Sequence, residues 1–525
     1  MKTNRVVWIF IAAITVLRLA LIATKDLEFD EAHYWLWSGR LAPAYFTKGP
    51  AVAFVIRAGT MLFGSSEFGV RFFSPIFAAG TSLLLFYFGR RLFGQIAALW
   101  LVIGLNVTPI FNVGAFLMTI DPLSIFFWTA SMYTFWLALE RTPNFSVYWP
   151  ATGLLAGLGF LAKYTNALEL VSIILVLAFA PRLRQEFKRP GLYSLLGMFV
   201  LCVIPPIVWN QQHAWVTLSH LWLKGGLNEE DVGFHFWEPL KFIGAHFLFY
   251  SPMLFLALVL GVARMVPRIN QQLKALFLFW FGVPVFVFYF LISLNKVAAP
   301  NWDALAFIGF ALLAAYAWRE WLESKAWFRA GACIGLVLGL IMSLFAVDSD
   351  LLGSLGFNLA RRDPMDRLRG WRSGAAAVEG LRHEWEAKLG EKLFLIADDR
   401  DRASEVSFYL KDKRLEGPGH PPVYLVESQD LLNQFSLWPR YDEFVTAPKE
   451  TAPTEDQPYS EGGVNLFTGR SALFIRDGAN GTLVHNIRAA FETAYPIAII
   501  EVQRNGRHVR TWRIFLCQHY RTLPL

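Results

Sequence analysis

The sequence predicts a polytopic α-helical membrane protein of about eleven spans, with a small C-terminal α/β domain on the outer face. Three observations predict this fold class. Apolar runs of bilayer length recur from Val6 to Val347 and then stop. The chain is 55% hydrophobic and 17% charged, whereas a soluble domain carries about 25% charged residues. Lys and Arg gather in alternate connections between the apolar runs, as they do in the cytoplasmic loops of membrane proteins.

The first apolar run, residues 6–24, follows Lys2 and Arg5 and has the charge pattern of a signal peptide. We expect a retained helix instead, because the run has spanning length, lacks a small-x-small cleavage site and leads directly into an acidic motif. The expected spans are 6–24, 71–89, 95–115, 121–139, 147–162, 166–181, 191–209, 241–263, 274–292, 304–318 and 328–347.

The charge bias predicts the orientation. Basic connections lie after the spans that end at residues 89, 139, 181, 263 and 318, which the positive-inside rule places in the cytoplasm. With an odd number of spans, the N-terminus is then cytoplasmic and the C-terminal domain lies on the outer face. Two long outer connections remain, 25–70 and 211–238. The first contains an apolar stretch, 51–63, that is broken by Arg57 and predicts a helix lying in the membrane interface.

Composition divides the chain into a transmembrane domain, 1–347, and a charged, Pro-containing domain, 348–525. In the second domain, residues 369–389 and 403–410 are expected to be helices. The expected strands are 392–397, 423–426, 472–475, 498–502 and 511–516.

The net charge of +7 is spread over these connections, and no basic arm interleaved with aromatic residues indicates nucleic acid. The three cysteines imply no disulfide framework.

The first candidate site is Asp30-Glu31-Ala32-His33-Tyr34-Trp35, just after the first span. A carboxylate pair at the end of a membrane helix costs free energy unless it meets water or a partner. Helix capping alone would also explain one acid there. Asp121, in Thr119-Ile120-Asp121-Pro122, is a second acid on the same predicted face, and it too could be only a helix cap. Two acids on one face predict a shared cavity.

Cations accompany these acids. Tyr45-Phe46-Thr47-Lys48-Gly49-Pro50 places a lysine, a common partner of phosphate, in a turn of the first outer loop. Lys48 could instead only reach toward lipid headgroups. Two further outer motifs pair a lysine with aromatic and hydrogen-bonding residues, which an interfacial belt would also explain. Their residues are Lys163 and Tyr164, and Lys296, Asn301 and Trp302.

With these motifs the chain resembles the bacterial dolichyl-phosphate-mannose protein mannosyltransferase-like family of type C glycosyltransferases, to which the lipid A aminoarabinose transferases are related. Further matches are Phe68-Gly69-Val70-Arg71 and Gly159-Phe160-Leu161-Ala162-Lys163 in the membrane region. In the soluble region, 363–371 and 433–438 resemble the outer domain of one bacterial branch.

The resemblance implies a glycosyltransferase that uses a polyprenyl-phosphate sugar donor and an acceptor that is a lipid, a glycan or a protein. Asp30 is then the leading catalytic carboxylate, Asp121 and Glu31 assist it, and Lys48 binds the carrier phosphate with help from Tyr45. His33, Tyr34, Lys163, Tyr164, Lys296, Asn301 and Trp302 complete the expected substrate site. The chain has Thr47 and Gly49 where the family commonly has Glu and Pro, and His33 where the aminoarabinose branch often has Arg.

From the chemistry we expect displacement on the face opposite the phosphate, and hence inversion at the anomeric carbon. The sequence demands no cofactor, although Asp30, Glu31 and Asp121 would suit a hard divalent cation. The rival interpretation is a transporter or flippase. Transporters are often built from inverted repeats with sites at the midplane, whereas here no repeat is visible and the charged motifs gather at one face.

Overall fold

The computed structural model describes residues 2–224, 233, 235–295, 298–350, 363–417, 419–426, 428, 430–443, 465–504 and 507–521. Its contacts divide the chain into two compact units. The first unit comprises residues 1–24 and 41–359, and the second comprises 25–40 and 360–525. The predicted division at residues 347 and 348 stays a prediction of where the membrane part ends. The sequence did not indicate that 25–40 groups with the C-terminal residues.

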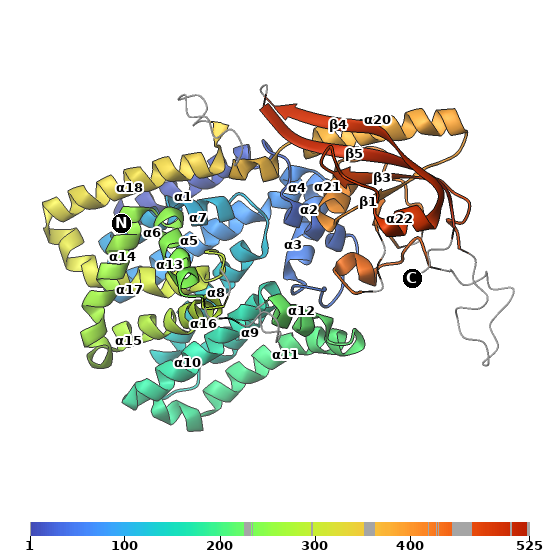
Figure 1. The fold of residues 1–525 in the computed structure, drawn as a ribbon. Coiled ribbons are helices and arrows are strands. Elements are labelled where there is room, and N and C mark those ends of the chain that lie inside the picture. The colour runs from blue at the N-terminus through green and yellow to red at the C-terminus, as the bar shows by residue number, and fades with distance from the viewer. Residues whose placement is uncertain are drawn as a thin grey trace, which may run out of the picture. The chain divides into compact units, whose positions relative to one another are not determined.

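The first unit is helical throughout its described part (Figure 1). Its first half contains α1 (Lys2–Leu21), α3 (Ala51–Phe63), α4 (Glu67–Arg71), α5 (Phe73–Phe93), α6 (Gln95–Asn106), α7 (Pro109–Gly114), α8 (Ile120–Leu139), α9 (Tyr148–Ala162), η1 (Tyr164–Ala167) and α10 (Leu168–Phe179). Its second half contains η2 (Pro181–Lys188), α11 (Pro190–Gln212), α12 (Val216–Lys224), α13 (Trp237–Phe249), α14 (Pro252–Met265), η3 (Val266–Gln271), α15 (Leu273–Trp280), α16 (Val283–Ser293), α17 (Ala304–Ser324) and α18 (Ala326–Val347).

Within the described residues, eight helices are long and apolar enough to cross a membrane, or up to nine if a bent pair counts as one span. The multi-pass helical fold class is confirmed, and the difference from about eleven spans has local causes. The expected span 95–115 is the short α6 followed by α7, and η2 bends away from the preceding helix by 118°. The expected span 147–162 is α9, which has only 15 residues and is not among the eight. The expected span 241–263 still supplies one long helix, Pro252–Gln271, although it breaks between α13 and α14, because Pro252 disfavours helical geometry at Ser251, which adopts a φ of 66°.

The core of the first unit gathers around α8 and α17. Three aromatic side chains there are fully buried: Trp128 of α8, Phe277 of α15 and Phe281, which directly follows α15. The rings of Phe277 and Phe281 stack with their centroids 4.6 Å apart. A buried polar contact also lies in this unit: Arg18, 1% exposed, donates to Asn106 at 3.0 Å and to Asn112 at 2.9 Å. Its partners let a charged side chain remain among apolar helices.

The second unit combines a five-stranded sheet with helices (Figure 1), and it confirms the predicted α/β class. The strand order is β2-β1-β3-β5-β4, with β1 parallel to β2 and β3 and with antiparallel pairing of β5 to β3 and β4. All expected strands and both expected helices are present. The elements are α2 (Phe29–Ser38), η4 (Pro364–Leu368), α20 (Trp371–Leu389), β1 (Phe394–Ala397), α21 (Arg400–Tyr409), β2 (Val423–Leu425), η5 (Gln434–Leu437), β3 (Ala472–Asp477), α22 (His485–Ala490), β4 (Phe491–Arg504) and β5 (Arg507–Tyr520).

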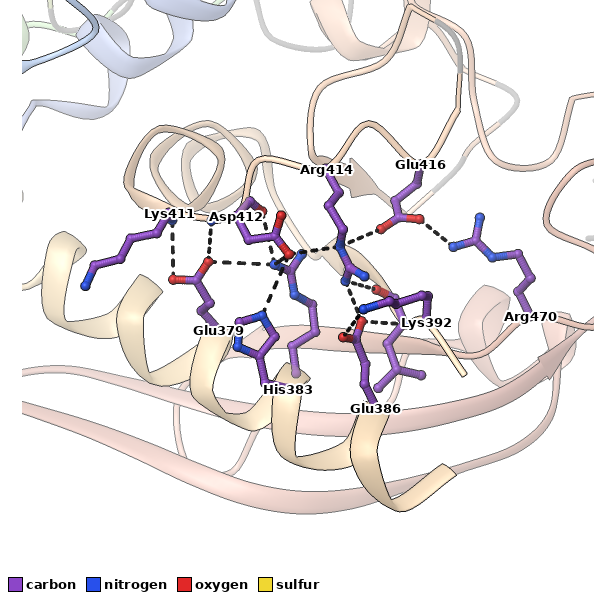
Figure 2. Close-up of polar contacts among 11 residues, drawn as sticks. Glu379, His383, Glu386, Lys392, Lys411, Asp412, Arg414, Glu416 and Arg470 are labelled. Atoms are coloured by element: carbon purple, nitrogen blue, oxygen red, sulfur yellow. Dashed lines mark hydrogen bonds and ion pairs between the residues drawn. The ribbon is translucent and has the colours of Figure 1, made fainter. Parts of the chain in front are cut away.

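A network of ion pairs joins α20 to the segment that follows α21 (Figure 2). Arg382, 1% exposed, donates to the carbonyl of Asp412 at 3.0 Å, while Arg414 contacts Glu386 and Glu416. Glu416 also pairs with Arg470, next to β3. Because charges that share several partners form a network, these contacts fix the loop after α21 more firmly than isolated surface pairs would.

Candidate active site

Asp121 lies in the first turn of α8, and it is not the residue that caps this helix. Thr119 is the N-cap and its hydroxyl accepts a hydrogen bond from the backbone N–H of Asp121 at 3.3 Å. The Asp121 carboxylate points to other partners instead. Capping of the helix end by that carboxylate therefore does not explain why an acid stands here.

Lys163 and Asn301 hold both oxygens of Asp121. Lys163 Nζ lies 3.0 Å from Oδ1, and Asn301 Nδ2 donates to Oδ2 at 3.0 Å. The same ammonium group also reaches the carbonyls of Asn301 at 3.4 Å and Trp302 at 3.2 Å. Four residues from three separately predicted motifs, Asp121, Lys163, Asn301 and Trp302, thus meet in one cluster within the first unit.

Two residues that support this cluster were missed. Asp303 is fully buried, and both its carboxylate oxygens lie 3.1 Å from His246 Nε2. His246 Nδ1 in turn lies 2.7 Å from the carbonyl oxygen of Phe242. Since Asp303 directly follows Asn301 and Trp302, the pair fixes the turn that presents their carbonyls to Lys163. The signal in the sequence was an acid adjoining a predicted motif and a lone histidine in an apolar span.

The turn that carries Lys48 packs against the end of α9, at Leu161, which lies two residues before Lys163 in the sequence. Tyr45 N–H donates to the carbonyl of Lys48 at 3.1 Å, and the Tyr45 hydroxyl accepts from Ala42 N–H at 3.1 Å. Tyr45 is 1% exposed, and burial raises the pKa of its hydroxyl to about 12. Lys48 is partly buried, whereas its neighbours in the turn are buried.

Gly49 makes the closest contact of this turn, and replacing it with alanine is expected to displace Lys48. A Cβ at this position would lie 2.0 Å from the backbone oxygen of Leu161, which cannot move aside as a side chain would. Overpacking of this kind costs about 1–3 kcal/mol or more. We expect Gly49→Ala to lower the thermal midpoint of the purified protein and to raise KM for the lipid-linked donor. Gly64→Ala is not a fair control because its φ is positive, so Gly197→Ala, with nothing within 4 Å, serves instead.

The acidic helix α2 belongs to the second unit, and its capping residue is Glu28. Glu28 accepts from Asp30 N–H at 2.8 Å, and Glu31 accepts from Glu28 N–H at 2.9 Å. Glu31 is fully buried in this capping box, whereas Asp30 contributes only its backbone to it. Of the two acids, Asp30 is therefore the one whose carboxylate is available for other contacts, and Arg400 Nη2 lies 3.5 Å from its Oδ1.

His33 and Tyr34, expected to bind substrate, are 2% and 3% exposed in this unit. His33 Nδ1 lies 3.1 Å from the Ser404 hydroxyl, and its ring stacks on Phe435 at 5.6 Å. Burial, with a smaller effect of Arg400, lowers the pKa of His33 well below its ordinary value, which keeps the imidazole neutral. These contacts give His33 a packing role, and substrate contact stays a prediction.

The remaining predicted residues are placed as follows. Tyr164 begins η1, and its ring lies 4.9 Å from that of Phe160. Lys296 lies outside the described residues. In the part of the chain that the structure describes, no group of three or more His, Cys, Asp or Glu side chains is arranged to hold a metal ion. Asp30 belongs to the second unit and Asp121 and Lys48 to the first, so their meeting in one cavity stays a prediction.

Glu405 of α21 is a buried carboxyl group near α2. It is fully buried, and among the described residues neither of its carboxylate oxygens has a hydrogen-bond partner. Burial and the nearby acids Glu28, Asp26 and Glu31 raise its pKa well above the ordinary value, which Arg510 opposes. Burial and Asp30 likewise raise the pKa of Glu28 to about 8. Burial therefore favours the protonated form of both carboxyl groups in the folded protein.

This arrangement predicts a stability that depends on pH. A carboxyl whose folded pKa is raised contributes stability that is present below its unfolded pKa of about 4.3 and is lost as the pH rises through the folded pKa, which for Glu28 is about 8. We expect the thermal midpoint of the wild type to decrease as the pH rises from 5 to 8. We expect this decrease to be smaller in Glu405→Met. Glu384 is an exposed glutamate in the same unit, and Glu384→Met should leave the pH dependence of the thermal midpoint as in the wild type. Equal pH slopes in wild type and Glu405→Met would contradict the assignment.

Comparison with known proteins bears on both the fold and the enzyme class. The model of a family described as dolichyl-phosphate-mannose-protein mannosyltransferase matches residues 47–209. The lipid A galacturonosyltransferase RgtD of Rhizobium johnstonii is 25% identical over 406 residues, which cover 77% of this chain and 82% of that protein. The undecaprenyl phosphate-alpha-4-amino-4-deoxy-L-arabinose arabinosyl transferase 1 of Sodalis glossinidius is 28% identical over 340 residues, which cover 61% of this chain and 58% of that protein.

Among solved structures, the chain is similar to ArnT from Cupriavidus metallidurans in its apo state, with a TM-score of 0.59 at 16% identity over 98% of both chains. The same protein bound to undecaprenyl phosphate gives a TM-score of 0.54. At this identity the likeness concerns the fold, and it confirms the predicted type C glycosyltransferase fold. The family match and the two relatives confirm the predicted transferase class over the transporter alternative.

Proposed function

We propose that this chain moves a hexosyl or pentosyl group from a polyprenyl phosphate, such as undecaprenyl phosphate, to a lipid A-like glycolipid. It is a multi-pass membrane enzyme among the type C glycosyltransferases related to dolichyl-phosphate-mannose protein mannosyltransferases. The reaction takes place at the outer face of a bacterial inner membrane. The basic connections then lie in the cytoplasm with the N-terminus, and the C-terminal unit is periplasmic. The observation that carries the proposal is the cluster of Asp121, Lys163 and Asn301 beside the Lys48 turn, in a unit whose core is mostly apolar. Charged residues placed in this way in membrane proteins are characteristic of functional sites.

The residues suggest a division of roles. The acceptor hydroxyl attacks the anomeric carbon, its proton passes to a carboxylate, and the bond from that carbon to the phosphate oxygen breaks. Both oxygens of Asp121 are engaged by Lys163 and Asn301, whereas Arg400 contacts only Oδ1 of Asp30. Asp30 is therefore assigned as the base. A positioned base contributes about 10²–10⁴-fold to the rate.

Lys48 meets the charge of the departing phosphate. The leaving phosphate gains negative charge as the glycosidic bond breaks, and a cation fixed in advance stabilises that charge without reorganising. The rigid turn of Tyr45 and Gly49 supplies such fixation. The charge of Asp121 is partly neutralised by Lys163, and we assign Asp121 the role of positioning the sugar in the site.

The test is transfer of a labelled sugar in membranes that lack the endogenous gene. The donor panel includes galacturonosyl and 4-amino-4-deoxy-arabinosyl polyprenyl phosphates, and products are separated into glycolipid, glycan and protein fractions. Label in the glycolipid fraction is expected. Label in protein would contradict the acceptor class, and intact donor found across the membrane without transfer would favour a flippase. Inversion at the anomeric carbon, read by NMR of the product, is expected, and retention would contradict single displacement.

A further inference from the structure

Helix α2, which carries Asp30, is held by residues more than 300 positions later in the chain. Trp371 N–H donates to Asp26 Oδ2 at 3.0 Å, and Leu27 N–H donates to the Tyr409 hydroxyl at 2.7 Å. These two contacts fix the chain just before α2 begins. The backbone that leads into the acidic helix is therefore set by α20 and α21.

The body of the helix and its exit are held as well. α2 packs against α21, beside which it lies in Figure 1, and the Trp35 ring meets Phe408 edge-on at 5.0 Å. Just after the helix, Arg40 Nε donates to the carbonyl of Gly419 at 2.7 Å, and its guanidinium lies over the Trp438 ring at 5.1 Å. The segment 25–40 thus folds as an integral element of the second unit and not as a free loop of the membrane unit.

One cation of this unit reaches the Asp30 carboxylate itself. Arg400 is the first residue of α21, whose start is fixed by the Asp399 side chain accepting from Arg402 N–H at 2.8 Å. Arg400 Nη2 lies 3.5 Å from Asp30 Oδ1, and Arg400 Nε lies 3.2 Å from Asp401 Oδ1. The guanidinium therefore contacts both carboxylates, and Asp401 helps to hold it beside Asp30.

We propose that the C-terminal unit is a working part of the transferase, in which α20 and α21 hold helix α2 and Arg400 orients the Asp30 carboxylate. This inference rests on the proposed function, because it assigns Arg400 as a positioning residue for the carboxylate that takes the acceptor proton. Contact with Oδ1 directs Oδ2 to the acceptor hydroxyl. The Arg400–Asp30 pair is about one-third exposed, at 32% and 36%, so it contributes little to stability. Its expected effect is on geometry, where a displacement of about 1 Å can cost about 10²-fold in rate.

The test compares full-length wild type, Arg400→Ala, Arg400→Gln and Arg400→Lys by steady-state transfer and by hydrogen exchange of the 29–38 amides. Arg521→Ala is the matched control, because Arg521 pairs with Glu492 at 2.8 Å in the same unit and is 65% exposed. We expect Arg400→Ala and Arg400→Gln to lower kcat about 10-fold to 100-fold with KM for the donor unchanged. Arg400→Lys should recover part of the loss, since lysine keeps the charge but loses the planar fork. Exchange in α2 should stay as in wild type.

Three results would overturn the inference while leaving the proposed function intact: wild-type kcat in both neutral variants, an equal loss in Arg521→Ala, or faster exchange in α2 that accompanies the loss of kcat. The last would mean that Arg400 supports the helix and does not orient the carboxylate. If Arg400→Ala does not fold, Arg400→Gln decides. A wild type that transfers no sugar overturns the proposed function, and the inference with it.

Discussion

Replacing Lys163 with methionine is expected to destabilise the membrane unit by about 3–5 kcal/mol and to abolish transfer. The Lys163 side chain is 9% exposed and Asp121 is 16% exposed, so removal of the ammonium group leaves a carboxylate and two carbonyls without their cation. An unpaired buried charge costs far more than the pair itself contributes. Thermal denaturation of the protein in detergent, run beside the transfer assay, measures both effects.

A matched control and a double variant separate stability from chemistry. Lys241→Met removes an exposed lysine, 62% accessible, that pairs with Glu238, and it should change stability by less than about 1 kcal/mol. Asp121→Leu combined with Lys163→Met should regain much of the lost stability, because apolar residues can replace a buried pair at little cost. Transfer should stay absent in the double variant. Recovery of transfer would show that the pair is only structural.

The sequence predicted the fold class because its signals are local. Apolar runs of bilayer length and the short apolar β-type runs after residue 391 each report on their own segment, and the structure has helices and strands at those places. The number of long spans was harder to predict. Early helix ends, such as that of α6 at Asn106, and the bend before η2 depend on backbone geometry, which a count of apolar residues does not register.

The candidate residues were predicted by type and by membrane side, which is how Lys163 and Asn301 were found before their contacts with Asp121 were known. What the sequence could not provide was pairing over long separations. Nothing local indicates that Asp303 pairs with His246, or that Asp30 meets Arg400 across 370 positions. Similarly, the role of Glu31 in a capping box requires the start of α2 to be known to within one residue.

Asp30→Asn is expected to lower kcat about 10²–10⁴-fold while leaving the fold intact. The amide keeps the shape of the side chain and cannot accept the acceptor proton. The helix should tolerate the change, because Glu28 and Glu31 form its cap and Asp30 contributes only its backbone N–H there. Asp442→Asn, in an ion pair with Arg440 of the same unit, is the control and should keep wild-type transfer.

The central claim is tested most directly by one comparison, sugar transfer from labelled polyprenyl-phosphate donors by wild type and by Asp30→Asn in membranes lacking the endogenous gene. The account predicts that wild type moves label from the carrier to the acceptor, and that the folded variant transfers at least about 10²-fold less label. Equal transfer by a variant with the wild-type thermal midpoint would contradict it, because Asp30 would then be a structural residue of α2 and not the base of the reaction.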